Sequence, residues 1–321
     1  MTRHTRSCYS VFDGMETHEE LRPYLFAIAY RMLGSVAEAE DVVQDAFLRY
    51  HEAEIEADSP KAYLATITTR LAIDQLRSAR ARREVYPGEW LPEPLVEDDA
   101  QRHAEMSDSL SLAFLHLLEK LSPVERAVFL LREVFDYPYD EVARIVDKSP
   151  DNCRQILTRA HRHIDEGRRR FDVSREEREE VARRFLAAWE QGDTEGLVEL
   201  LAPDATVYGD GGGKAPAVPV PLVGAERVAK ALIGWGRQAH ERGFTHRPAL
   251  VNGEPGLVLS GPEGAVWVAA FEIADGFVIA VRSILNPDKL AHVARATEAE
   301  PLRSPRVPTS SLRECGKPPR A

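Results

Sequence analysis

Several side chains near the start of one predicted helix have the chemistry needed to read base pairs in duplex DNA. They are Asp151, Asn152, Arg154 and Gln155. Arginine pairs with guanine, and asparagine or glutamine pairs with adenine, through hydrogen bonds in the major groove. Arg159 and Arg162 follow farther along the same segment. Their positions suit phosphate contacts, which position a protein on DNA without specifying the sequence.

Such side chains must be presented by a helix that fits the groove. The apolar spacing predicts one helix from Val124 to about Phe135, a turn at residues 136–138, and a short helix around Val142 to Ile145. A third helix is predicted to begin at Ser149. This order is a helix-turn-helix arrangement, whose second helix enters the major groove. A three-helix protein-interaction module with a basic surface is the alternative that this segment leaves open.

The charge of the chain is strongly segregated. Its net charge is −11 over 321 residues, whereas a DNA-binding protein usually has a basic balance. Residues 36–58 contain eight acidic residues and one arginine. Residues 70–84 contain five arginines and residues 154–170 contain six, each against two acidic residues. One acidic and two basic stretches indicate two kinds of partner, although charge runs are often only solvated helix faces.

Several classes of protein are not favoured by the composition. The sequence is 44% hydrophobic and 29% charged, and it has no apolar run of the roughly 20 residues that a membrane helix needs. The N-terminal residues lack the apolar stretch of a signal peptide, so we expect a cytoplasmic protein with no membrane partner. The cysteines Cys8, Cys153 and Cys315 are scattered, which favours neither a disulfide framework nor a zinc site. We expect no metal and no cofactor.

The first half of the chain is predicted to be all-helical and divided by a linker. Helix starts are indicated at Ser35, Ser59, Ser122 and Ser149, because each supplies a capping oxygen followed by Pro or Glu in the first turn. Prolines and acidic residues interrupt the helical spacing between 85 and 107. We therefore expect a first helical module at 16–84 and a second one at 108–171.

The second half is predicted to be a compact α+β domain at 174–295. Ser174 and Glu177 form a capping box, and Gly192 is a plausible helix end. Asp275-Gly276 is predicted to be a two-residue hairpin turn. The pattern predicts helices followed by several antiparallel strands, at 205–208, 257–260, 265–273 and 277–285. Residues 296–321 are predicted to be a disordered tail, because Pro, Ser and Arg predominate there.

Two long segments give a specific family resemblance. The segment FAIAYRMLGSVAEAEDVVQDAFLRY, residues 26–50, resembles region two of extracytoplasmic-function (ECF) sigma factors. PKAYLATITTRLAIDQLR, residues 60–77, continues that resemblance, and residues 122–162 resemble region four. Together they cover about half of the chain in the order and spacing of the family. The resemblance implies two all-α modules in a transcription initiation factor.

The resemblance also implies partners, namely RNA polymerase core and promoter DNA. In such factors the acidic helix of region two binds a coiled coil of the polymerase, which assigns that contact to Glu40, Asp41, Gln44 and Asp45. The next helix and the loop before it capture the melted minus-ten element, for which the candidates are Tyr63, Thr66, Thr69, Arg70 and Arg77. Helix packing is the alternative role for Tyr63. Region four would read the minus-thirty-five element through Asp151, Asn152, Arg154, Gln155, Arg159 and Arg162. The linker would thread toward the polymerase active-site channel.

Three short strings resemble a subgroup of these factors that has a C-terminal SnoaL-like domain. They are Trp90-Leu91-Pro92-Glu93-Pro94 in the linker, Asp210-Gly211-Gly212-Gly213-Lys214, and Asn286-Pro287-Asp288-Lys289-Leu290. Successive glycines permit close approach of the backbone to a partner. Trp90 among prolines is a stiff, amphipathic ligand for an apolar groove. The resemblance implies that the domain contacts the linker and regulates the factor in cis, and we expect the second and third strings to contact Trp90.

SnoaL-like folds are cones with a pocket, and some relatives are isomerases or hydrolases. The acid or base candidates are Asp204, Asp210, His240 and His246, but their spacing does not make a catalytic pair. We expect no catalytic residues and no enzyme activity, and a small-molecule ligand in the pocket is a further candidate partner. An isomerase, a hydrolase or a ligand sensor fused to a DNA-binding module is the alternative function. A repressor that acts without polymerase is a third reading, which the acidic helix disfavours.

Overall fold

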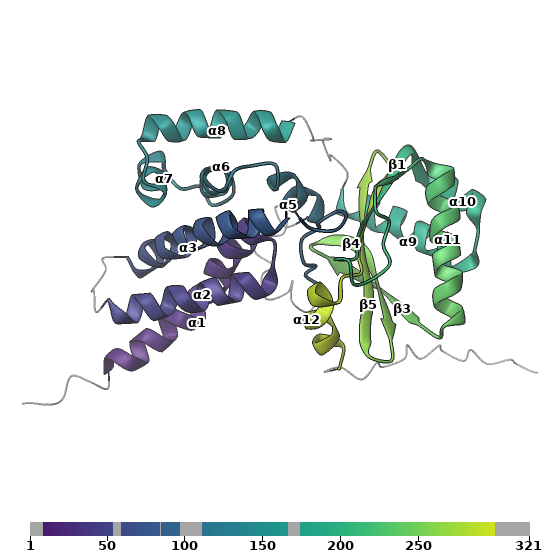
Figure 1. Cartoon of the computed structure of the whole chain (residues 1–321), viewed down its shortest axis with the longest axis horizontal. Coiled ribbons are helices and arrows are strands. Elements are labelled where there is room, and N and C mark those ends of the chain that lie inside the picture. Colours follow the sequence, from purple (N-terminus) through teal and green to yellow (C-terminus); the bar gives the residue numbers. More distant parts are fainter. Residues whose placement is uncertain (1–8, 54–58, 84, 97–110, 166–173, 299–321) are drawn as a thin grey trace, which may run out of the picture.

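The computed structural model describes residues 9–53, 59–83, 85–96, 111–165 and 174–298. It consists of a helical half, in which the linker connects two modules, and a C-terminal α+β domain (Figure 1). Of the predicted tail at 296–321, residues 296–298 belong to the last helix and the rest lies outside the described residues, as does the predicted linker beyond Val96.

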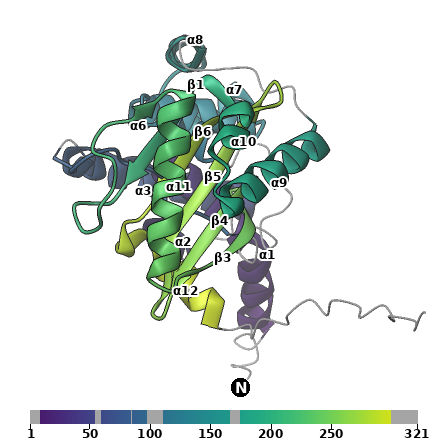
Figure 2. The same cartoon turned by 90° about the vertical axis from the view of Figure 1, so that its right-hand side faces the viewer.

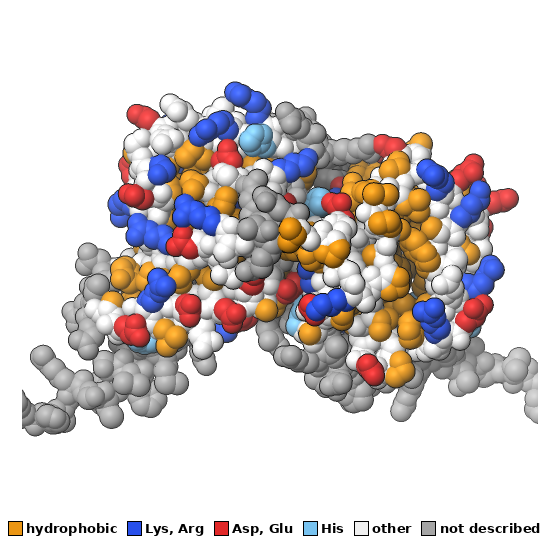
Figure 3. All heavy atoms as spheres, viewed as in Figure 1, with side chains coloured by type: hydrophobic (Ala, Val, Ile, Leu, Met, Phe, Trp, Pro, Cys, Tyr) orange, Lys and Arg blue, Asp and Glu red, His pale blue; other side chains and the backbone are white. Residues whose placement is uncertain are grey.

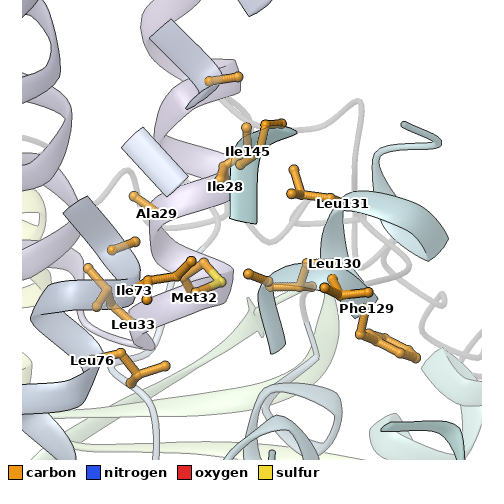
Figure 4. Close-up of a cluster of buried hydrophobic side chains, with 14 of the residues drawn as sticks. Ile28, Ala29, Met32, Leu33, Ile73, Leu76, Phe129, Leu130, Leu131 and Ile145 are labelled. Atoms are coloured by element: carbon orange, nitrogen blue, oxygen red, sulfur yellow. The ribbon is translucent and has the colours of Figure 1, made fainter. Parts of the chain in front are cut away.

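The helical half contains two modules that share one apolar core. The first module consists of α1 (Tyr9–Leu33), α2 (Val36–Glu52) and α3 (Pro60–Arg83). The second consists of α5 (Leu112–Leu118), α6 (Pro123–Phe129), the π-helical turn η2 (Leu130–Val134), α7 (Tyr139–Val146) and α8 (Pro150–Asp165). Figure 4 shows side chains of α1 and α3 facing those of α6, η2 and α7. The two modules are therefore packed on each other.

The C-terminal domain is built on one six-stranded sheet. Its elements are α9 (Arg175–Gln191), α10 (Thr194–Leu200), β1 (Leu201–Asp210), β2 (Leu222–Val223), α11 (Ala225–Glu241), β3 (Thr245–Val251), β4 (Glu254–Gly261), β5 (Gly264–Ala274), β6 (Phe277–Ile284) and α12 (Pro287–Glu298). The strand order is β2-β1-β6-β5-β4-β3. Helices α9, α10 and α11 cover one face of the sheet, and α12 lies on the face toward the helical half (Figures 1 and 2).

The apolar contacts of the linker identify the surface on which it lies. Leu91 is fully buried and Val96 is nearly so, and both belong to an apolar cluster that includes Val251, Ile284 and Leu290 of the C-terminal domain. Val96 also forms an isolated antiparallel bridge with Val251. The described part of the linker is thus packed against the sheet.

The local predictions of helix ends and turns are confirmed where a side chain makes a cap. Ser35, Ser122 and Ser174 each accept a hydrogen bond from the backbone N–H three residues later, and Ser122 and Ser174 form complete capping boxes. Gly192 ends α9 with φ 70°, and Asp275 and Gly276 both have positive φ in the predicted hairpin turn.

Three features of the fold differ from the sequence prediction. The expected continuous helix from Val124 to Phe135 changes into the π-helical turn η2 after Phe129. The strands are not all antiparallel, because β1 pairs with β6 in parallel. Helix α11 and the edge strand β3 were not predicted. Gly234 and Gly236 weaken the helical signal of α11, and Pro248 lies within β3, where an edge strand tolerates proline.

Candidate nucleic-acid interface and linker contact

The predicted helix-turn-helix is formed by α7 and α8. Helix α7 ends at Asp147, which adopts a left-handed conformation with φ 54°. The Ser149 side chain then accepts a hydrogen bond of 3.2 Å from the backbone N–H of Asn152, which caps the start of α8. The apolar side of α8, including Ile156 and Ala160, is buried. Its opposite side is therefore presented outward, as Figure 1 shows.

Most of the predicted base-reading side chains lie on this outward side of α8. Asp151, Arg154, Gln155, Arg159 and Arg162 are exposed, and Asn152 is half-buried. Nη1 of Arg154 lies 2.6 Å from Oδ1 of Asp151, and its guanidinium lies 4.9 Å from the centre of the Tyr139 ring. Because an exposed ion pair contributes little, Arg154 can exchange Asp151 for another partner.

The predicted single-strand contacts on α3 are less accessible. Thr69 is completely buried, and Tyr63 is half-buried with its ring 5.9 Å from that of Tyr50. The Thr66 hydroxyl donates to the carbonyl of Ala62. Arg77 is exposed and pairs with Asp74 at 2.9 Å. These side chains therefore do not form one open surface in this arrangement.

Arg70 connects α3 to the second helical module. Its Nε donates to the carbonyl oxygen of Ile145 at 2.9 Å, and its Nη2 donates to that of Arg144 at 2.8 Å. These carbonyls belong to the last turn of α7, where helical carbonyls lack intrahelical partners and favour a cation. The Arg70 guanidinium thus binds the C-terminal end of α7.

The seam between the two helical modules is also held by buried polar groups. Arg126 is 1% exposed, and its Nη1 donates to the carbonyl oxygen of Met32 at 2.7 Å. The hydroxyls of Tyr24 and Tyr137 lie 2.7 Å apart across the same seam. Burial raises the pKa of both tyrosines. A buried polar group is costly without its partner. These pairs therefore favour the arrangement in which the two helical modules are packed on each other, which we call the closed arrangement.

The acidic face of α2 remains accessible in the closed arrangement. Asp41, Gln44 and Asp45 are exposed, whereas Glu40 is half-buried and forms an ion pair with Arg22. Leu48, one turn beyond Gln44, is 52% exposed on the same helix face. This face of α2 is thus accessible to a partner that presents basic side chains around an apolar one.

Asp210 is the centre of the contact between the linker and the C-terminal domain. Its side chain has no exposed surface. Oδ1 accepts hydrogen bonds from the Tyr86 hydroxyl at 2.6 Å and from the Gly212 amide at 3.1 Å. Oδ2 accepts from the Leu91 amide at 2.8 Å and from Nζ of Lys289 at 2.7 Å. One buried carboxylate therefore joins all three predicted strings.

Lys289 and Asn286 hold the linker from the start of α12. Nζ of Lys289 also donates to the Leu91 carbonyl, and it lies 4.1 Å from the centre of a Trp90 ring. Such a distance is typical of a cation–π contact. Nδ2 of Asn286 donates to the Tyr86 hydroxyl at 2.8 Å. The third string contacts Trp90 as predicted, through Lys289, whereas the contacts of the second string with the linker are to Tyr86, Leu91 and Pro87.

The glycines of the second string are needed for close approach. A Cβ on Gly212 would lie 2.3 Å from Nδ2 of Asn286, and one on Gly213 would lie 2.8 Å from a Pro87 carbon. Both have positive φ, of 58° and 70°. Lys214 pairs with Asp288 at 2.5 Å in an exposed position. In these two strings Gly211 and Leu290 are buried, and Pro287 is exposed.

The linker also contacts the first helical module, through Glu93. Its Oε1 accepts from the Ser35 hydroxyl at 2.8 Å, and its Oε2 accepts from the Val36 amide at 2.7 Å. The carboxylate therefore caps the N-terminus of α2, where a negative charge is favourable. Trp90 lies against Gly34, on which a Cβ would be 2.8 Å from the indole. Pro92 and Pro94 are buried beside them.

Family comparisons match both helical modules and the C-terminal domain. The family description Sigma-70 region 2 matches residues 17–82, Sigma-70, region 4 matches 111–164, and SnoaL-like domain matches 182–281. The chain is 36% identical over 284 residues to ECF RNA polymerase sigma factor SigJ of Mycobacterium tuberculosis, covering 84% of this chain and 91% of that protein. The chain belongs to the ECF sigma factor family. Its first helical module is therefore sigma region 2, and its second is sigma region 4.

Two further comparisons extend this ECF sigma factor assignment to the whole chain. A probable ECF sigma factor, SigI of Mycobacterium tuberculosis, is 32% identical and covers 84% of this chain and 92% of its own length. The crystal structure of Mycobacterium tuberculosis SigJ superposes with a TM-score of 0.73 at 33% identity. It covers 86% of this chain and 98% of the SigJ chain. The C-terminal SnoaL-like domain is thus part of the shared architecture.

Sequence reasoning missed several residues of this sigma factor that hold the linker. Tyr86 bridges Asp210 and Asn286, and Nε2 of His292 lies 2.7 Å from the Pro94 carbonyl oxygen. Asn252 contacts both the linker and Tyr30 of α1. Asn252-Gly253 reads as an ordinary hairpin turn, so only its burial reveals a second role.

The acid or base candidates of the C-terminal domain serve separate local contacts. Asp210 is occupied by the linker, and Asp204 is an exposed residue earlier on β1. His240 is exposed on α11. Nε2 of His246 lies 2.8 Å from Oε1 of Glu190 at the end of α9. The contacts of Asp210 and His246 are thus made with different partners, on the linker and on α9.

No helix in the described ranges combines the length and the apolar character that a membrane span requires.

Proposed function

We propose that this ECF sigma factor binds RNA polymerase core, directs promoter-specific initiation, and is regulated in cis by linker capture on its SnoaL-like domain. The observation that carries the regulatory part is the buried Asp210 carboxylate, which binds Tyr86, Leu91 and Lys289 at once. Regulation by capture of the linker requires such a specific and reversible contact. This function also places the chain where RNA polymerase acts, in the bacterial cytoplasm.

The roles of the two helical modules follow from the family. We assign minus-thirty-five recognition to the outward face of α8, and minus-ten capture to α3 with the loop before it. Polymerase docking is assigned to the acidic face of α2, which stays exposed. In the closed arrangement Arg70 is bonded to carbonyl oxygens at the end of α7, and Thr69 is buried. We therefore propose that the two regions separate before the minus-ten element is bound.

The overall charge supports a dependence on polymerase. Non-specific DNA affinity comes mainly from neutralisation of phosphates by cations, and this chain has a net charge of −11. Two modest basic stretches on such a protein bind free DNA weakly. Promoter binding then requires the polymerase to contribute.

The linker connects these activities. In the family the linker threads toward the polymerase active-site channel, and a linker bound to the sheet through Leu91 and Val96 is not available for that path. We therefore propose that initiation includes release of the linker from the SnoaL-like domain.

We propose a small molecule bound by the SnoaL-like domain as one signal for this release. Figure 3 shows hydrophobic side chains gathered on the viewed face of this domain, over the region between the sheet and α11. Val220, Val223 and Trp235 are among the exposed large hydrophobic side chains of the described residues. Exposed apolar patches often mark ligand sites. A compound that raises the melting temperature of the full chain without changing run-off transcription would contradict this part of the proposal.

The test is run-off transcription with bacterial core polymerase on the promoter region beside the protein's own gene. We compare the full chain, a chain ending at Phe171 and the Asp210→Asn variant, with Asp204→Asn as the control on the same strand. We expect truncation and Asp210→Asn to change the transcript level, and Asp204→Asn to leave it unchanged. Equal transcription from all four would refute cis regulation, and failure of the full chain to bind core would refute the proposed polymerase contact.

A further inference from the structure

Asn252 is a buried residue at the tip of the β3–β4 hairpin, and it makes three hydrogen bonds outside that hairpin. It is 1% exposed. Its backbone N–H donates to the Leu95 carbonyl at 2.7 Å, and its Oδ1 accepts from the Leu95 amide at 2.8 Å. Its Nδ2 donates to the Tyr30 hydroxyl at 2.8 Å. The hairpin of the SnoaL-like domain is thus bonded both to the linker and to α1 of region 2.

The hydrogen-bond chain continues from Tyr30 to the start of α2. The Tyr30 hydroxyl donates to the Glu93 carbonyl at 2.6 Å, and the Glu93 amide donates to the Gly34 carbonyl at 2.8 Å. The Glu93 carboxylate then accepts from Val36, the first residue of α2. A path of hydrogen bonds therefore runs from Asn252 through Tyr30 and Glu93 to the N-terminus of α2, the proposed polymerase-docking helix.

The backbone of Asn252 explains why this residue type suits the position. Its φ is 54°, a left-handed conformation that asparagine, aspartate and glycine adopt with little strain. Only asparagine among these supplies an acceptor for the Leu95 amide and a permanent donor for Tyr30. Asp275 has φ 52° at the corresponding place in the β5–β6 hairpin, but its side chain is exposed. The same turn conformation thus occurs in two hairpins of this domain. The hydrogen bonds to the linker described above are made by Asn252.

We infer that Asn252 and Tyr30 form a direct contact through which the SnoaL-like domain lowers the affinity of region 2 for RNA polymerase core. This inference rests on the proposed polymerase docking of α2. Asn252 acts as a positioning residue, because it holds Leu95 and Tyr30 and, through them, Glu93 at the start of α2. The contact is distinct from that of Asp210, which holds Tyr86 and Leu91 on the other side of Glu93.

The direction of the effect follows from competition for the linker. A linker that enters the polymerase must leave Asn252, so docking of the closed chain includes the loss of these hydrogen bonds. In a variant without the Asn252 side chain, docking does not require the loss of the side-chain hydrogen bonds. The hydrogen bonds of one such side chain correspond to about a five- to tenfold change in an equilibrium constant.

The experiment measures binding of the full chain to core polymerase by a fluorescence titration, without DNA. We expect Asn252→Gly, which keeps the left-handed turn, to bind core about five- to tenfold more tightly than the unchanged chain. Tyr30→Phe removes the bridging hydroxyl and should shift the affinity in the same direction. Asp275→Gly is the matched control, since it places glycine at the corresponding position of the other hairpin, and should bind like the unchanged chain.

A second readout follows the start of α2 directly. Hydrogen exchange at the Val36 amide should be faster in Asn252→Gly and Tyr30→Phe than in Asp275→Gly, because the Glu93 cap is less firmly held. Unchanged or weaker core binding by Asn252→Gly, in a chain that remains folded, would overturn the inference. If the unchanged chain does not bind core, the proposed function fails, whereas the Val36 exchange rates still decide whether Asn252 controls the cap.

Discussion

Nε of Arg70, on α3 of region 2, donates a hydrogen bond of 2.9 Å to the carbonyl oxygen of Ile145, in the last turn of α7 of region 4. The same guanidinium is a predicted contact for the single-stranded minus-ten element. If that prediction holds, DNA and α7 compete for one cation. Packing of the two regions on each other would then oppose promoter binding.

Weakening this seam should expose the α3 surface. Ile145 is 3% exposed and belongs to the apolar cluster shown in Figure 4. Replacing it by alanine should cost about 2–4 kcal/mol of unfolding free energy. It should also raise the affinity for a single-stranded minus-ten oligonucleotide, measured by fluorescence anisotropy. Ile156→Ala, in the buried side of α8, should destabilise by a similar amount without raising that affinity. Equal oligonucleotide binding by both variants would contradict the prediction.

The Lys289–Asp210 pair should be strongly coupled, because both side chains are almost sealed from water. Removing one partner of a buried pair costs about 3–5 kcal/mol. A double-mutant cycle with Asp210→Asn and Lys289→Met, measured by urea unfolding, should give a coupling energy above about 1 kcal/mol. The Lys214–Asp288 pair is the control, since both of its side chains are more than half exposed. A cycle on this exposed pair should give at most about 1 kcal/mol, and a larger value there than at Asp210 would argue against the buried pair as the main contact.

His116 on α5 should make the closed arrangement sensitive to acid. Burial, and then the charge of Arg282, lower its pKa to about 4. At neutral pH the imidazole is uncharged, so its Nε2, which lies 3.3 Å from Oε1 of Glu89, does not form an ion pair with that carboxylate. The unfolded chain binds this proton at the ordinary histidine pKa, so stability should fall as the pH drops from about 6.5 to 4. The loss is on the order of 3 kcal/mol for a shift of this size. His116→Gln should remove this part of the pH dependence in thermal unfolding, and an unchanged profile would refute it.

Two side chains on α8 should affect minus-thirty-five binding in different ways. Gln155→Ala removes a predicted base contact, so it should cost about 1–3 kcal/mol on the preferred sequence and relax the choice of base at one position. Arg162→Ala removes a predicted phosphate contact, so it should weaken all sequences equally and reduce the salt dependence. The measurement is binding of holoenzyme to a set of promoter variants at several salt concentrations. Uniform weakening by Gln155→Ala would remove it from the base-reading set.

Much of the local structure could be predicted from the sequence, because its signals involve few neighbouring residues. Ser35, Ser122 and Ser174 cap helices through residues three positions away, and Asp275-Gly276 forms a turn on its own. The three strings were predicted to meet, but only on the basis of a family resemblance. The residue types alone do not predict a contact between Asp210 and Lys289, which are 79 positions apart in the sequence.

The features that could not be predicted depend on distant parts of the chain. Helix α3 packs on helices of both modules, and no local pattern indicates that its Thr69 is buried. The parallel pairing of β1 with β6 depends on the crossing of the intervening chain. Asn252 was missed for a related reason, since its turn signal is complete without Tyr30.

The C-terminal domain holds the linker at two places that are only a few residues apart, one at Tyr86 and Leu91 and the other from Pro94 to Val96. When one place opens, the other keeps the freed segment near its partner at a high effective concentration, so rebinding is favoured. Complete release requires both places to be open at the same time. With such a bivalent attachment, small fluctuations rarely release the linker. A signal that weakens both places together raises the released fraction steeply.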